Sequence, residues 1–417
     1  MLRLLHTADW HLGRRFPSFP EEAQKKLSRA RMDVIPRILD VARRHSVNAV
    51  LCAGDLFDDP EPESDFWQEL AKRFRERGAQ HPPVFLVPGN HDPLTPESIW
   101  APGHAFRQAL PHWVHVVDRD DFTYELAPDA VLYARPCRSK AGENDLAMAL
   151  PARDPGDERV RIGCVHGSTF DMDGYETNFP IQRDAGVERG LDYLAIGDTH
   201  SFRDVTESLP VPTVYPGAPE PTTFGESGAG HVAIVALFRH GRRPRVDAEP
   251  VAFWRWIDVR CHDVNELRNL LTMSDLERHV VRLHLDMTVS LSEESEVERI
   301  LRDLEEPMRR TAARASSWWI PPTCGCNPAL ETPFLTIYLL CSGTPLHDWT
   351  GLLPMQRTNP TNRGRLARSR TFTNCCRATT LPLEVAYETP MPASFESRCD
   401  TGYGDRVRSR PQRPLWT

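Results

Sequence analysis

The chain has 417 residues and a formal net charge of −8, with 26% charged residues. This length is enough for two or more domains with a large core. The net negative charge excludes a positive electrostatic potential over the whole protein surface. Any contact with nucleic acid must therefore be made by a local basic patch. No apolar run approaches the roughly 20 residues that a membrane helix needs, and no signal peptide is expected because the first strand starts at Leu2. We therefore expect a cytoplasmic protein without membrane contact.

Five apolar, β-prone runs in the first half of the chain each lead into a motif rich in Asp, Asn and His. The runs are Leu2–Leu5, Ala49–Cys52, Val84–Val87, Val160–Val165 and Tyr193–Ile196. The motifs are Asp9-Trp10-His11, Gly54-Asp55-Leu56-Phe57-Asp58, Gly89-Asn90-His91-Asp92, Gly163-Cys164-Val165-His166-Gly167 and Gly197-Asp198-Thr199-His200. Singly, such motifs are typical of turns. Together they predict one site, because loops at the carboxyl ends of strands converge in layered α/β folds.

The intervening segments predict the layers of this fold. A helix over Glu22–His45 has an apolar face made of Val34, Ile35, Ile38, Leu39 and Ala42, the spacing of a helix packed on a sheet. Short strands without intervening helices follow at Trp113–Val117, Tyr124–Leu126 and Val131–Ala134, and a further strand pair at His231–Phe238 and Arg245–Ala252. We expect an α/β (α+β) fold in which two mixed β-sheets pack face to face and are flanked by helices.

The residue types in the motifs indicate metal-assisted hydrolysis of a phosphate ester. Two divalent ions about 3.5–4 Å apart lower the pKa of a shared water and hold the phosphoryl oxygens. Hard ions such as manganese and magnesium prefer carboxylate, amide oxygen and imidazole to thiolate. The candidate ligands of this kind are Asp9, His11, Asp55, Asn90, His166, Asp198 and His200. His91, which directly follows Asn90, is the candidate catalytic residue that protonates or stabilises the leaving oxygen.

Longer segments around the motifs resemble one family. They are Leu4–Gly13, Ala53–Asp58, Val87–Asp92 and Tyr215–Pro219, followed shortly by Phe224-Gly225-Glu226. Through them the chain resembles the calcineurin-like metallophosphoesterase superfamily, and within it the SbcD-type DNA double-strand-break repair exonuclease subunits. The resemblance covers residues 1–245 well and residues 250–312 loosely.

The resemblance implies a four-layer metallophosphoesterase fold and two bound divalent ions, Mn²⁺ or alternatively Mg²⁺. One ion would be held by Asp9, His11, Asp55 and His200, with Asp55 bridging to a second ion that Asn90, His166 and Asp198 complete. It also implies DNA as the substrate and an SbcC-like ATPase of the structural-maintenance type as the partner, with a homodimer as a further alternative.

One motif departs from the family pattern. The family usually has Gly-His-x-His where this chain has Gly197-Asp198-Thr199-His200. Aspartate can still bind a hard ion, and a third carboxylate brings two divalent ions and a bridging hydroxide close to neutrality. We therefore expect weaker phosphate attraction and a preference for manganese or magnesium over softer ions. Occupancy of the second ion site is the property that this departure puts in question.

A second unit follows the catalytic domain, which we expect to span residues 1–250. Residues 251–314 read as strand, helix, strand and helix, with strict alternation over Val281–Val289 and a capping box from Ser290 to Glu293. This piece resembles an incomplete form of the small capping domain of SbcD-type subunits, and a generic accessory lobe is the equal alternative. Residues 315–417 lack periodicity apart from Phe334–Leu340, and we expect an irregular tail that is disordered or the product of a shifted reading frame.

Three functions remain open from the sequence. The first is a metal-dependent DNA exonuclease or endonuclease subunit that works with an SbcC-like ATPase. The second is another calcineurin-like phosphoesterase acting on nucleotides or phosphoproteins. The third, a scaffold with a decayed site, is disfavoured because His91 and six of the seven usual ligand positions match. The Tyr215–Glu226 segment and the added second unit favour the first.

Overall fold

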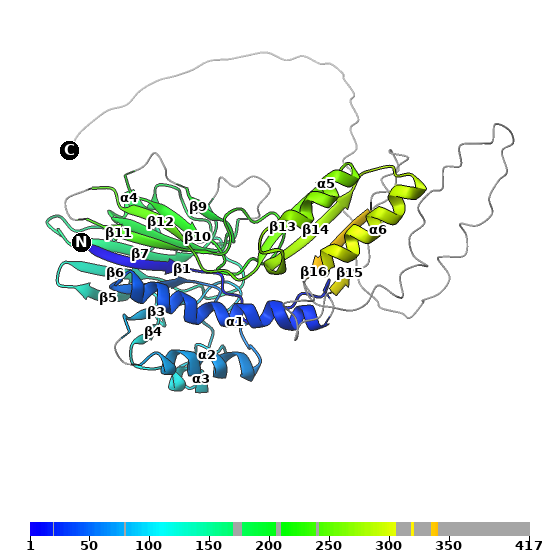
Figure 1. The fold of residues 1–417 in the computed structure, drawn as a ribbon. Helices are drawn as coiled ribbons and strands as arrows, with labels where there is room; N and C mark the ends of the chain where they lie inside the picture. The colour runs from blue at the N-terminus through cyan, green and yellow to red at the C-terminus, as the bar shows by residue number, and fades with distance from the viewer. Residues whose placement is uncertain are drawn as a thin grey trace, which may run out of the picture. The chain divides into compact units, whose positions relative to one another are not determined.

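The structure, a computed structural model, describes residues 1–19, 21–78, 81–169, 177–205, 210–238, 242–305, 318–320 and 335–340. In this part of the chain two six-stranded sheets pack face to face, and a four-stranded sheet is formed by later residues (Figure 1).

The first sheet has the order β12-β11-β1-β2-β3-β4. Its strands are β1 (Leu2–Thr7), β2 (Ala49–Ala53), β3 (Val84–Val87), β4 (Val114–Val116), β11 (His231–Leu237) and β12 (Arg245–Pro250). Strands β1 to β4 are parallel, whereas β11 is antiparallel to both β1 and β12. The three apolar runs that precede the first three motifs therefore end at the same edge of one sheet.

The second sheet has the order β5-β6-β7-β8-β10-β9. Its strands are β5 (Phe122–Ala127), β6 (Ala130–Ala134), β7 (Val160–His166), β8 (Tyr193–Gly197), β9 (Phe202–Asp204) and β10 (Thr213–Pro216). Strands β6, β7, β8 and β10 are parallel, and β5 and β9 are antiparallel edge strands. The other two motifs thus also share one edge, that of the second sheet.

The core between the two sheets is apolar. Leu4, Leu51 and Phe85 of the first sheet belong to one buried cluster with Leu132 and Ile162 of the second. Strands buried on both faces read as continuous apolar runs, which is why the sequence shows runs and not alternation here. The predicted fold of two mixed sheets flanked by helices is confirmed.

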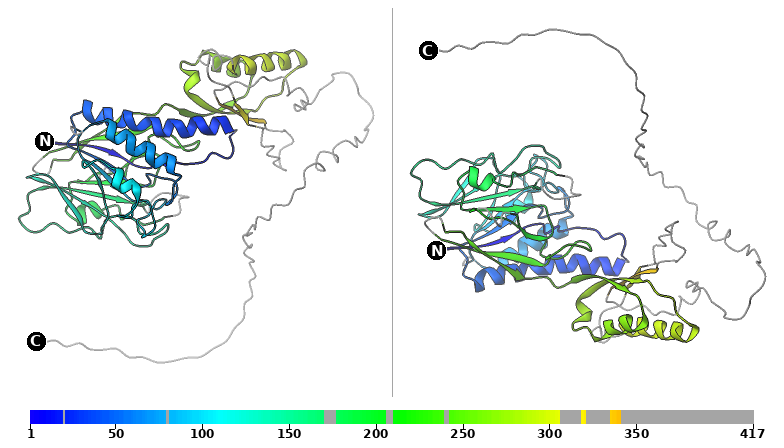
Figure 2. Two further views of the ribbon diagram at one scale, coloured as in Figure 1. Left: turned by 90° about the horizontal axis from the view of Figure 1, so that it is seen from below. Right: turned by 90° about the horizontal axis from the view of Figure 1, so that it is seen from above.

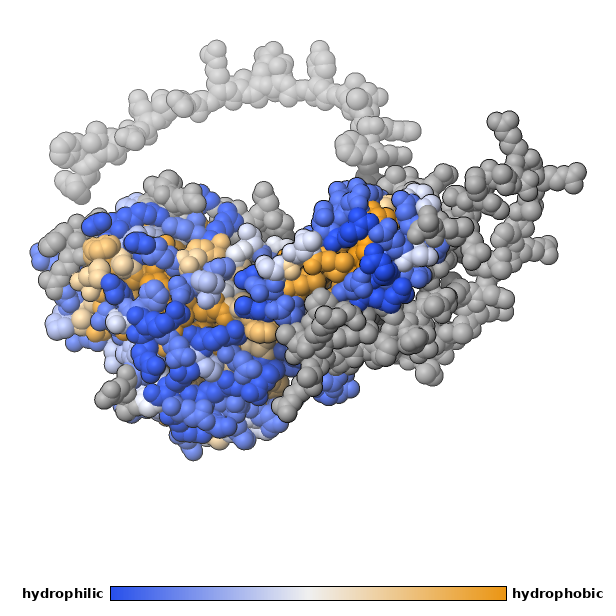
Figure 3. All heavy atoms as spheres, viewed as in Figure 1, coloured by the Kyte–Doolittle hydropathy of each residue, from blue (hydrophilic) through white to orange (hydrophobic). Residues whose placement is uncertain are grey.

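Helix α1 (Glu21–Arg44) covers the outer face of the first sheet, and the five apolar residues predicted to face the sheet are all buried. Helix α2 (Ser64–Glu76), which the sequence analysis did not predict, packs beside it through Leu70 and Phe74. The outer face of α2 is mostly hydrophilic (Figure 3), as expected for a helix with one apolar stripe. The short helices α3 (Ala105–Ala109) and α4 (Ala185–Glu188) complete this part of the fold.

The four-stranded sheet, with the helices packed on it, forms what we call the cap. Its order is β13-β14-β16-β15. The elements are β13 (Arg255–Cys261), α5 (Val264–Asn269), η1 (Leu270–Thr272), η2 (Leu276–Arg278), β14 (His279–Leu285), α6 (Leu291–Glu305), β15 (Trp318–Ile320) and β16 (Leu335–Leu340). The capping box at the start of α6 is present, because the Ser290 N–H donates to Glu293 Oε2 at 2.8 Å. The N-terminal half of α1 packs into the cap core through Leu27 and Ala30 (Figure 2).

The structure differs from the expected irregular tail at two places. Strand β16 pairs antiparallel with β14, and β15 pairs with β16. The apolar run Phe334–Leu340 was the only periodic signal in that segment, and it supplies β16. Residues 341–417, with the rest of the expected tail, lie outside the described residues. In the part of the chain that the structure describes, none of the helices has the length and apolar character to cross a membrane.

Candidate metal centre

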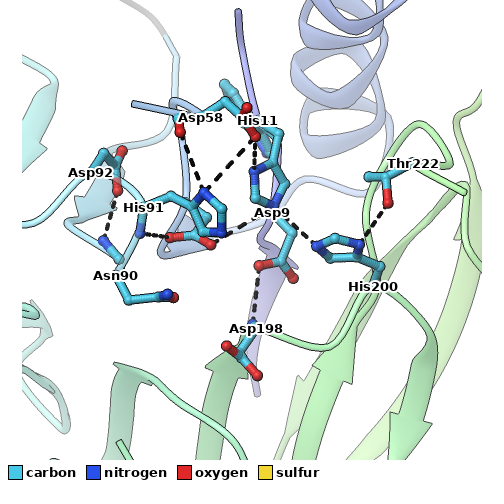
Figure 4. Close-up of polar contacts among 12 residues, drawn as sticks. Asp9, His11, Asp58, Asn90, His91, Asp92, Asp198, His200 and Thr222 are labelled. Carbon is cyan, nitrogen blue, oxygen red and sulfur yellow. Dashed lines mark hydrogen bonds and ion pairs between the residues drawn. The ribbon is translucent and has the colours of Figure 1, made fainter. Parts of the chain in front are cut away.

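The eight predicted site residues lie at the carboxyl ends of five strands, and the six of them that Figure 4 labels lie close together. Asp9 and His11 follow β1, Asp55 follows β2, Asn90 and His91 follow β3, His166 ends β7, and Asp198 and His200 follow β8. Within this group Asp9, His11 and His200 have donor atoms within 4.8 Å of one another, as do Asp9, Asp55 and His166. The convergence predicted from the motifs is therefore present.

The backbone at four of these residues is in the left-handed region. The φ angles are 55° at Asp9, 45° at His11, 52° at Asp55 and 116° at Asp198. Such conformations cost on the order of 1–3 kcal/mol for a residue other than glycine and persist at functional sites where the surroundings impose them. Glycine would relieve the strain, but it would remove the side chains that face the site.

His11 and His200 face each other through their Nε2 atoms, which are 3.0 Å apart. The Nδ1 atom of His11 lies 2.9 Å from Asp58 Oδ1, and that of His200 lies 2.9 Å from Glu226 Oε1. Because each Nδ1–H can donate to a carboxylate, the lone pairs of both Nε2 atoms are available to the space between them. Two nitrogen lone pairs at this separation repel each other, so the arrangement needs either a proton shared between the two nitrogens or a metal cation bound to one side of both. The pair therefore fits a metal ion.

His166 is oriented in the same way. Its Nδ1 atom lies 2.8 Å from the carbonyl oxygen of Ala53, where the N–H donates, and its Nε2 atom lies 2.7 Å from Asn90 Oδ1. The same Nε2 atom is 3.5 Å from Asp55 Oδ2 and 3.9 Å from Asp198 Oδ1. An amide oxygen and two carboxylate oxygens thus lie within 3.9 Å of one imidazole nitrogen, a set of donors that suits a hard divalent ion.

Asp55 lies between the two groups. Its Oδ2 atom is 3.7 Å from His11 Nε2 and 3.5 Å from His166 Nε2, while its Oδ1 atom accepts the backbone N–H of His91 at 2.9 Å. One oxygen of this carboxylate is therefore shared between the two histidine groups. This is the position that a bridging ligand would occupy.

The buried carboxylates of the site favour a bound cation. Burial raises the pKa of Asp9 to about 7, against the opposing effect of His166. Burial would lower the pKa of His166, but Asp55 and the other carboxylates raise it to about 10. Among the described residues, Oδ2 of the fully buried Asp9 has no hydrogen-bond partner. Ionised carboxylates in a buried site are stabilised by positive charge, which the protonated His166 supplies in part and metal ions would supply in full. Because a metal ion would displace the proton on His166, the affinity of the site for the metal should fall as pH decreases.

His91 differs from the ligand candidates in its exposure. Its side chain is 43% exposed, whereas those of His11 and His166 are fully buried. The Nδ1 atom of His91 lies 3.3 Å from the carbonyl oxygen of Asp58, and its ring meets that of His11 edge to face at 4.9 Å. His91 therefore stands at the rim of the site, next to the metal-ligand candidates, where a substrate can reach it.

Two glycines leave room for the ligands. A Cβ atom on Gly54, which has a φ of +94°, would lie 2.0 Å from Nδ1 of His166. A Cβ atom on Gly89 would lie 2.1 Å from Oδ1 and 2.3 Å from the backbone nitrogen of Asp55. Neither motif could carry a larger residue at these positions without moving a ligand.

Gly89→Ala should therefore weaken both the site and the fold. The clash with the backbone of Asp55 cannot be relieved by a rotamer change, so we expect a loss of about 1–3 kcal/mol in the free energy of unfolding and weaker Mn²⁺ binding. Urea unfolding of the metal-free protein and calorimetric titration with Mn²⁺ measure the two effects. Gly103→Ala is the matched control, because a Cβ atom there meets nothing within 4 Å. Equal behaviour of the two variants would contradict the close packing at Gly89.

Several functional side chains were missed by the sequence analysis. They are Asp58, which contacts His11; Asp92, which accepts the N–H groups of Gly89 and Phe57 at 2.8 and 3.0 Å; and Thr222 and Glu226, which contact His200. Asp58, Asp92 and Glu226 lie inside segments that had been singled out as motifs, so the signal was present. Their role could not be read from the sequence because it depends on which side chain of another loop they meet.

Comparison with known proteins agrees with this geometry. Residues 2–202 match the family model described as calcineurin-like phosphoesterase. The chain is 29% identical over 239 residues to the uncharacterized metallophosphoesterase YhaO of Bacillus subtilis, and the match covers 54% of this chain and 55% of that protein. It is 34% identical over 292 residues to the SbcD component of the nuclease SbcCD of Bacillus subtilis, covering 62% of this chain and 69% of that protein.

A third relative is more distant. The chain is 25% identical over 236 residues to the DNA double-strand break repair protein Mre11 of Methanopyrus kandleri, covering 54% of this chain and 50% of that protein. The chain thus spans about half the length of this relative and of YhaO, and more of the SbcD protein. It belongs to the calcineurin-like metallophosphoesterases, a family of metal-dependent hydrolases, and to the branch that includes the SbcD-type nuclease subunits.

Proposed function

We propose that this protein is the nuclease subunit of a DNA repair complex, which hydrolyses phosphodiester bonds in DNA with two divalent ions. The observation that carries the proposal is the position of Asp55 between the His11–His200 pair and the His166 group. Two ions in this arrangement would activate a water and hold the scissile phosphate. We propose Mn²⁺ as the metal, with Mg²⁺ as the alternative.

The ligand assignment is part of the proposal. One ion would be held by Asp9, His11, Asp55 and His200, and the second by Asp55, Asn90, His166 and Asp198. The distances between Nε2 of His166 and the oxygens of Asn90, Asp55 and Asp198 support the second set. The protein's own contribution is orientation, since each of the three histidines has its Nδ1 atom beside an oxygen acceptor.

The proposals for the DNA substrate and for the ATPase partner are based on the names of the relatives. SbcCD is named as a nuclease made of subunits, and Mre11 is named for DNA double-strand break repair. We propose that this chain acts likewise on DNA in the cytoplasm with an SbcC-like ATPase, and that the cap belongs to a DNA-holding domain that starts near residue 251. A homodimer is compatible with this arrangement.

A second function is favoured by one observation. YhaO is a metallophosphoesterase without an assigned substrate, and its similarity extends over as much of the chain as that of Mre11. Hydrolysis of nucleotides or phosphoproteins by the same site is therefore the competing candidate.

The two candidates are separated by substrate. The purified chain is incubated with end-labelled linear DNA, bis(p-nitrophenyl) phosphate, p-nitrophenyl phosphate and a phosphoserine peptide, with and without Mn²⁺. We expect Mn²⁺-dependent cleavage of DNA and of the diester, abolished by EDTA. Faster hydrolysis of the monoester or the phosphopeptide would favour the second candidate, and cleavage in the presence of EDTA would contradict both.

The unusual Asp198 gives a separate prediction. If this carboxylate holds the second ion, Asp198→Asn should weaken Mn²⁺ binding, because it removes a charge and keeps the shape. Asp198→His should retain activity and broaden metal tolerance, since it restores the residue usual in the family. The alternative is that Asp198 only closes the turn, where its backbone N–H donates to Asp9 Oδ1 at 3.0 Å. Two ions bound by Asp198→Asn with unchanged affinity in calorimetry would establish that alternative.

A further inference from the structure

The segment from Glu220 to Glu226 lies between the metal-ligand candidate His200 and the cap. At one end, the Glu226 carboxylate is 8% exposed and faces Nδ1 of His200. At the other end, Glu220 accepts the backbone N–H groups of Phe253 and Trp254, at 2.6 and 3.2 Å, where the chain enters the cap. A short segment thus contacts both the candidate metal centre and the chain that leads into the first strand of the cap.

Glu226 and Thr222 both contact Nδ1 of His200, at 2.9 and 2.7 Å. The Oε1 atom of Glu226 makes the first of these contacts, and its Oε2 atom accepts the backbone N–H of Thr222 at 2.8 Å. The Thr222 hydroxyl contacts both Glu226 and His200. A carboxylate that accepts the Nδ1–H of an imidazole fixes its tautomer and ring orientation and makes Nε2 a stronger ligand. Threonine alone could not supply that charge.

The cap contacts the same segment through one indole ring. Trp256 of β13 packs edge to face on Phe224 with ring centroids 4.8 Å apart. The same ring also contacts Phe16 at 6.1 Å and Phe19 at 5.5 Å, in the segment that follows His11. One side chain of the cap therefore touches a chain segment next to each of the facing histidines.

The backbone of the two segments is tied together as well. Arg31 is buried, and its guanidinium donates to the carbonyl oxygen of Trp10 at 3.0 Å and to that of Pro221 at 2.8 Å. A displacement of the segment beside Phe224 would therefore be transmitted to the motif that carries Asp9 and His11. Packed side chains and hydrogen bonds of this kind are the physical route by which a shift in one part can change another.

We propose that Glu226 is a positioning residue for His200 and that Trp256 couples the cap to the His11–His200 pair. Metal binding at this pair then depends on how the cap packs against Phe224, Phe16 and Phe19. This inference rests on the proposed function, because it takes the pair to hold an ion. It assigns to the cap a role in the metal centre itself, in addition to any contact with substrate.

The test for Glu226 is metal binding by the full chain. Calorimetric titration with Mn²⁺ should show two ions in the parent protein and a loss of about 10–100-fold in the affinity of one of them in Glu226→Ala, the usual effect of removing such a partner. Glu226→Gln should lose less, because its amide oxygen still accepts the Nδ1–H. Glu76→Ala, at an exposed position that pairs with Lys72, is the matched control.

The test for the cap uses Trp256. Trp256→Ala should weaken the same ion as Glu226→Ala, while Trp256→Phe keeps an aromatic ring against Phe224 and should restore binding. Phe253→Ala is the control, since that aromatic side chain of the same segment is 39% exposed and its ring contacts are with Trp254 and Arg278. Thermal unfolding of the metal-free variants must match that of the parent if the effect is one of positioning.

The outcomes separate this inference from the proposed function. A parent protein that takes up no Mn²⁺ contradicts the proposed function and the inference together. A parent with two ions, beside Glu226→Ala and Trp256→Ala variants with unchanged affinities, contradicts the inference alone. If the two variants lost both ions equally and also unfolded at a lower temperature, Glu226 and Trp256 would have only a structural role. That result would also contradict the inference.

Discussion

Asp55→Asn should remove metal-dependent hydrolysis almost completely. The substitution keeps the shape of the side chain and an oxygen that can accept the backbone N–H of His91, now 2.9 Å from Oδ1. It removes the charge of a carboxylate whose Oδ2 atom lies 3.7 Å from His11 Nε2 and 3.5 Å from His166 Nε2. Charge stabilisation by a metal is worth several kcal/mol, so a loss of at least about 10³-fold in rate follows.

The physical state of Asp55 supports this expectation. Burial by itself would raise the pKa of this carboxyl, but the neighbouring His166 and the other histidines hold it well below its usual range. Asp55 is therefore ionised at neutral pH, and its negative charge is available to two cations at once. An asparagine offers one neutral oxygen in the same place.

The measurement is DNA hydrolysis together with calorimetric titration of Mn²⁺. Asp121→Asn is the matched control, because its side chain is 90% exposed and lies in a loop before β5. Asp55→Asn should lose binding of both ions, whereas the control should match the parent protein. A fully active Asp55→Asn variant would refute the two-metal interpretation, and loss of only one ion would show that Asp55 does not bridge.

The metal-ligand candidates could be predicted from the sequence because they lie directly after β-prone apolar runs. Asp9, Asp55 and Asn90 each follow an apolar run, and parallel strands place the ends of such runs at one edge. His166 and Asp198 were predicted in the same way from the second sheet. The convergence thus depended on strand order alone, which short connections and parallel pairing restrict to few arrangements.

The residues that orient the histidines could not be assigned in this way. Glu226 meets His200 because β10 pairs beside β8, which brings the segment after β10 next to the loop that carries His200. No periodicity in the sequence encodes that pairing. The contact between Trp256 and Phe224 likewise joins two elements whose relative position depends on packing between the cap and the catalytic domain. Contacts of this kind depend on tertiary structure, whereas the ligands depend on local motifs.

The strands of the cap illustrate the same limit. The alternation over Val281–Val289 predicted a strand, and β14 confirms it as far as Leu285, where the strand ends. Alternating burial is a local property of a strand with one buried face. The pairing of β16 with β14 is antiparallel and spans an intervening helix, and it could not be inferred from an isolated apolar run at Phe334–Leu340. Short apolar runs are ambiguous between strand and buried helix until a partner strand is known.

His91→Ala should retain metal binding and lose catalysis. The contact of this residue with Asp55 is made by its backbone N–H, which alanine keeps. The imidazole itself is 43% exposed at the rim of the site, beside Asp58. If it protonates or stabilises the leaving oxygen, its removal should cost about 10²–10⁴-fold in rate, the usual scale of general acid catalysis.

The dependence on the leaving group tests this role of His91. The rate of DNA cleavage, which expels a poorly stabilised sugar oxygen, should fall by the full factor in His91→Ala. Hydrolysis of bis(p-nitrophenyl) phosphate should fall much less, because p-nitrophenolate leaves without protonation. His112→Ala, at an exposed position before β4, is the control. Equal losses on both substrates would mean that His91 acts before bond cleavage, and a parallel loss of Mn²⁺ binding would make it a ligand or a structural residue.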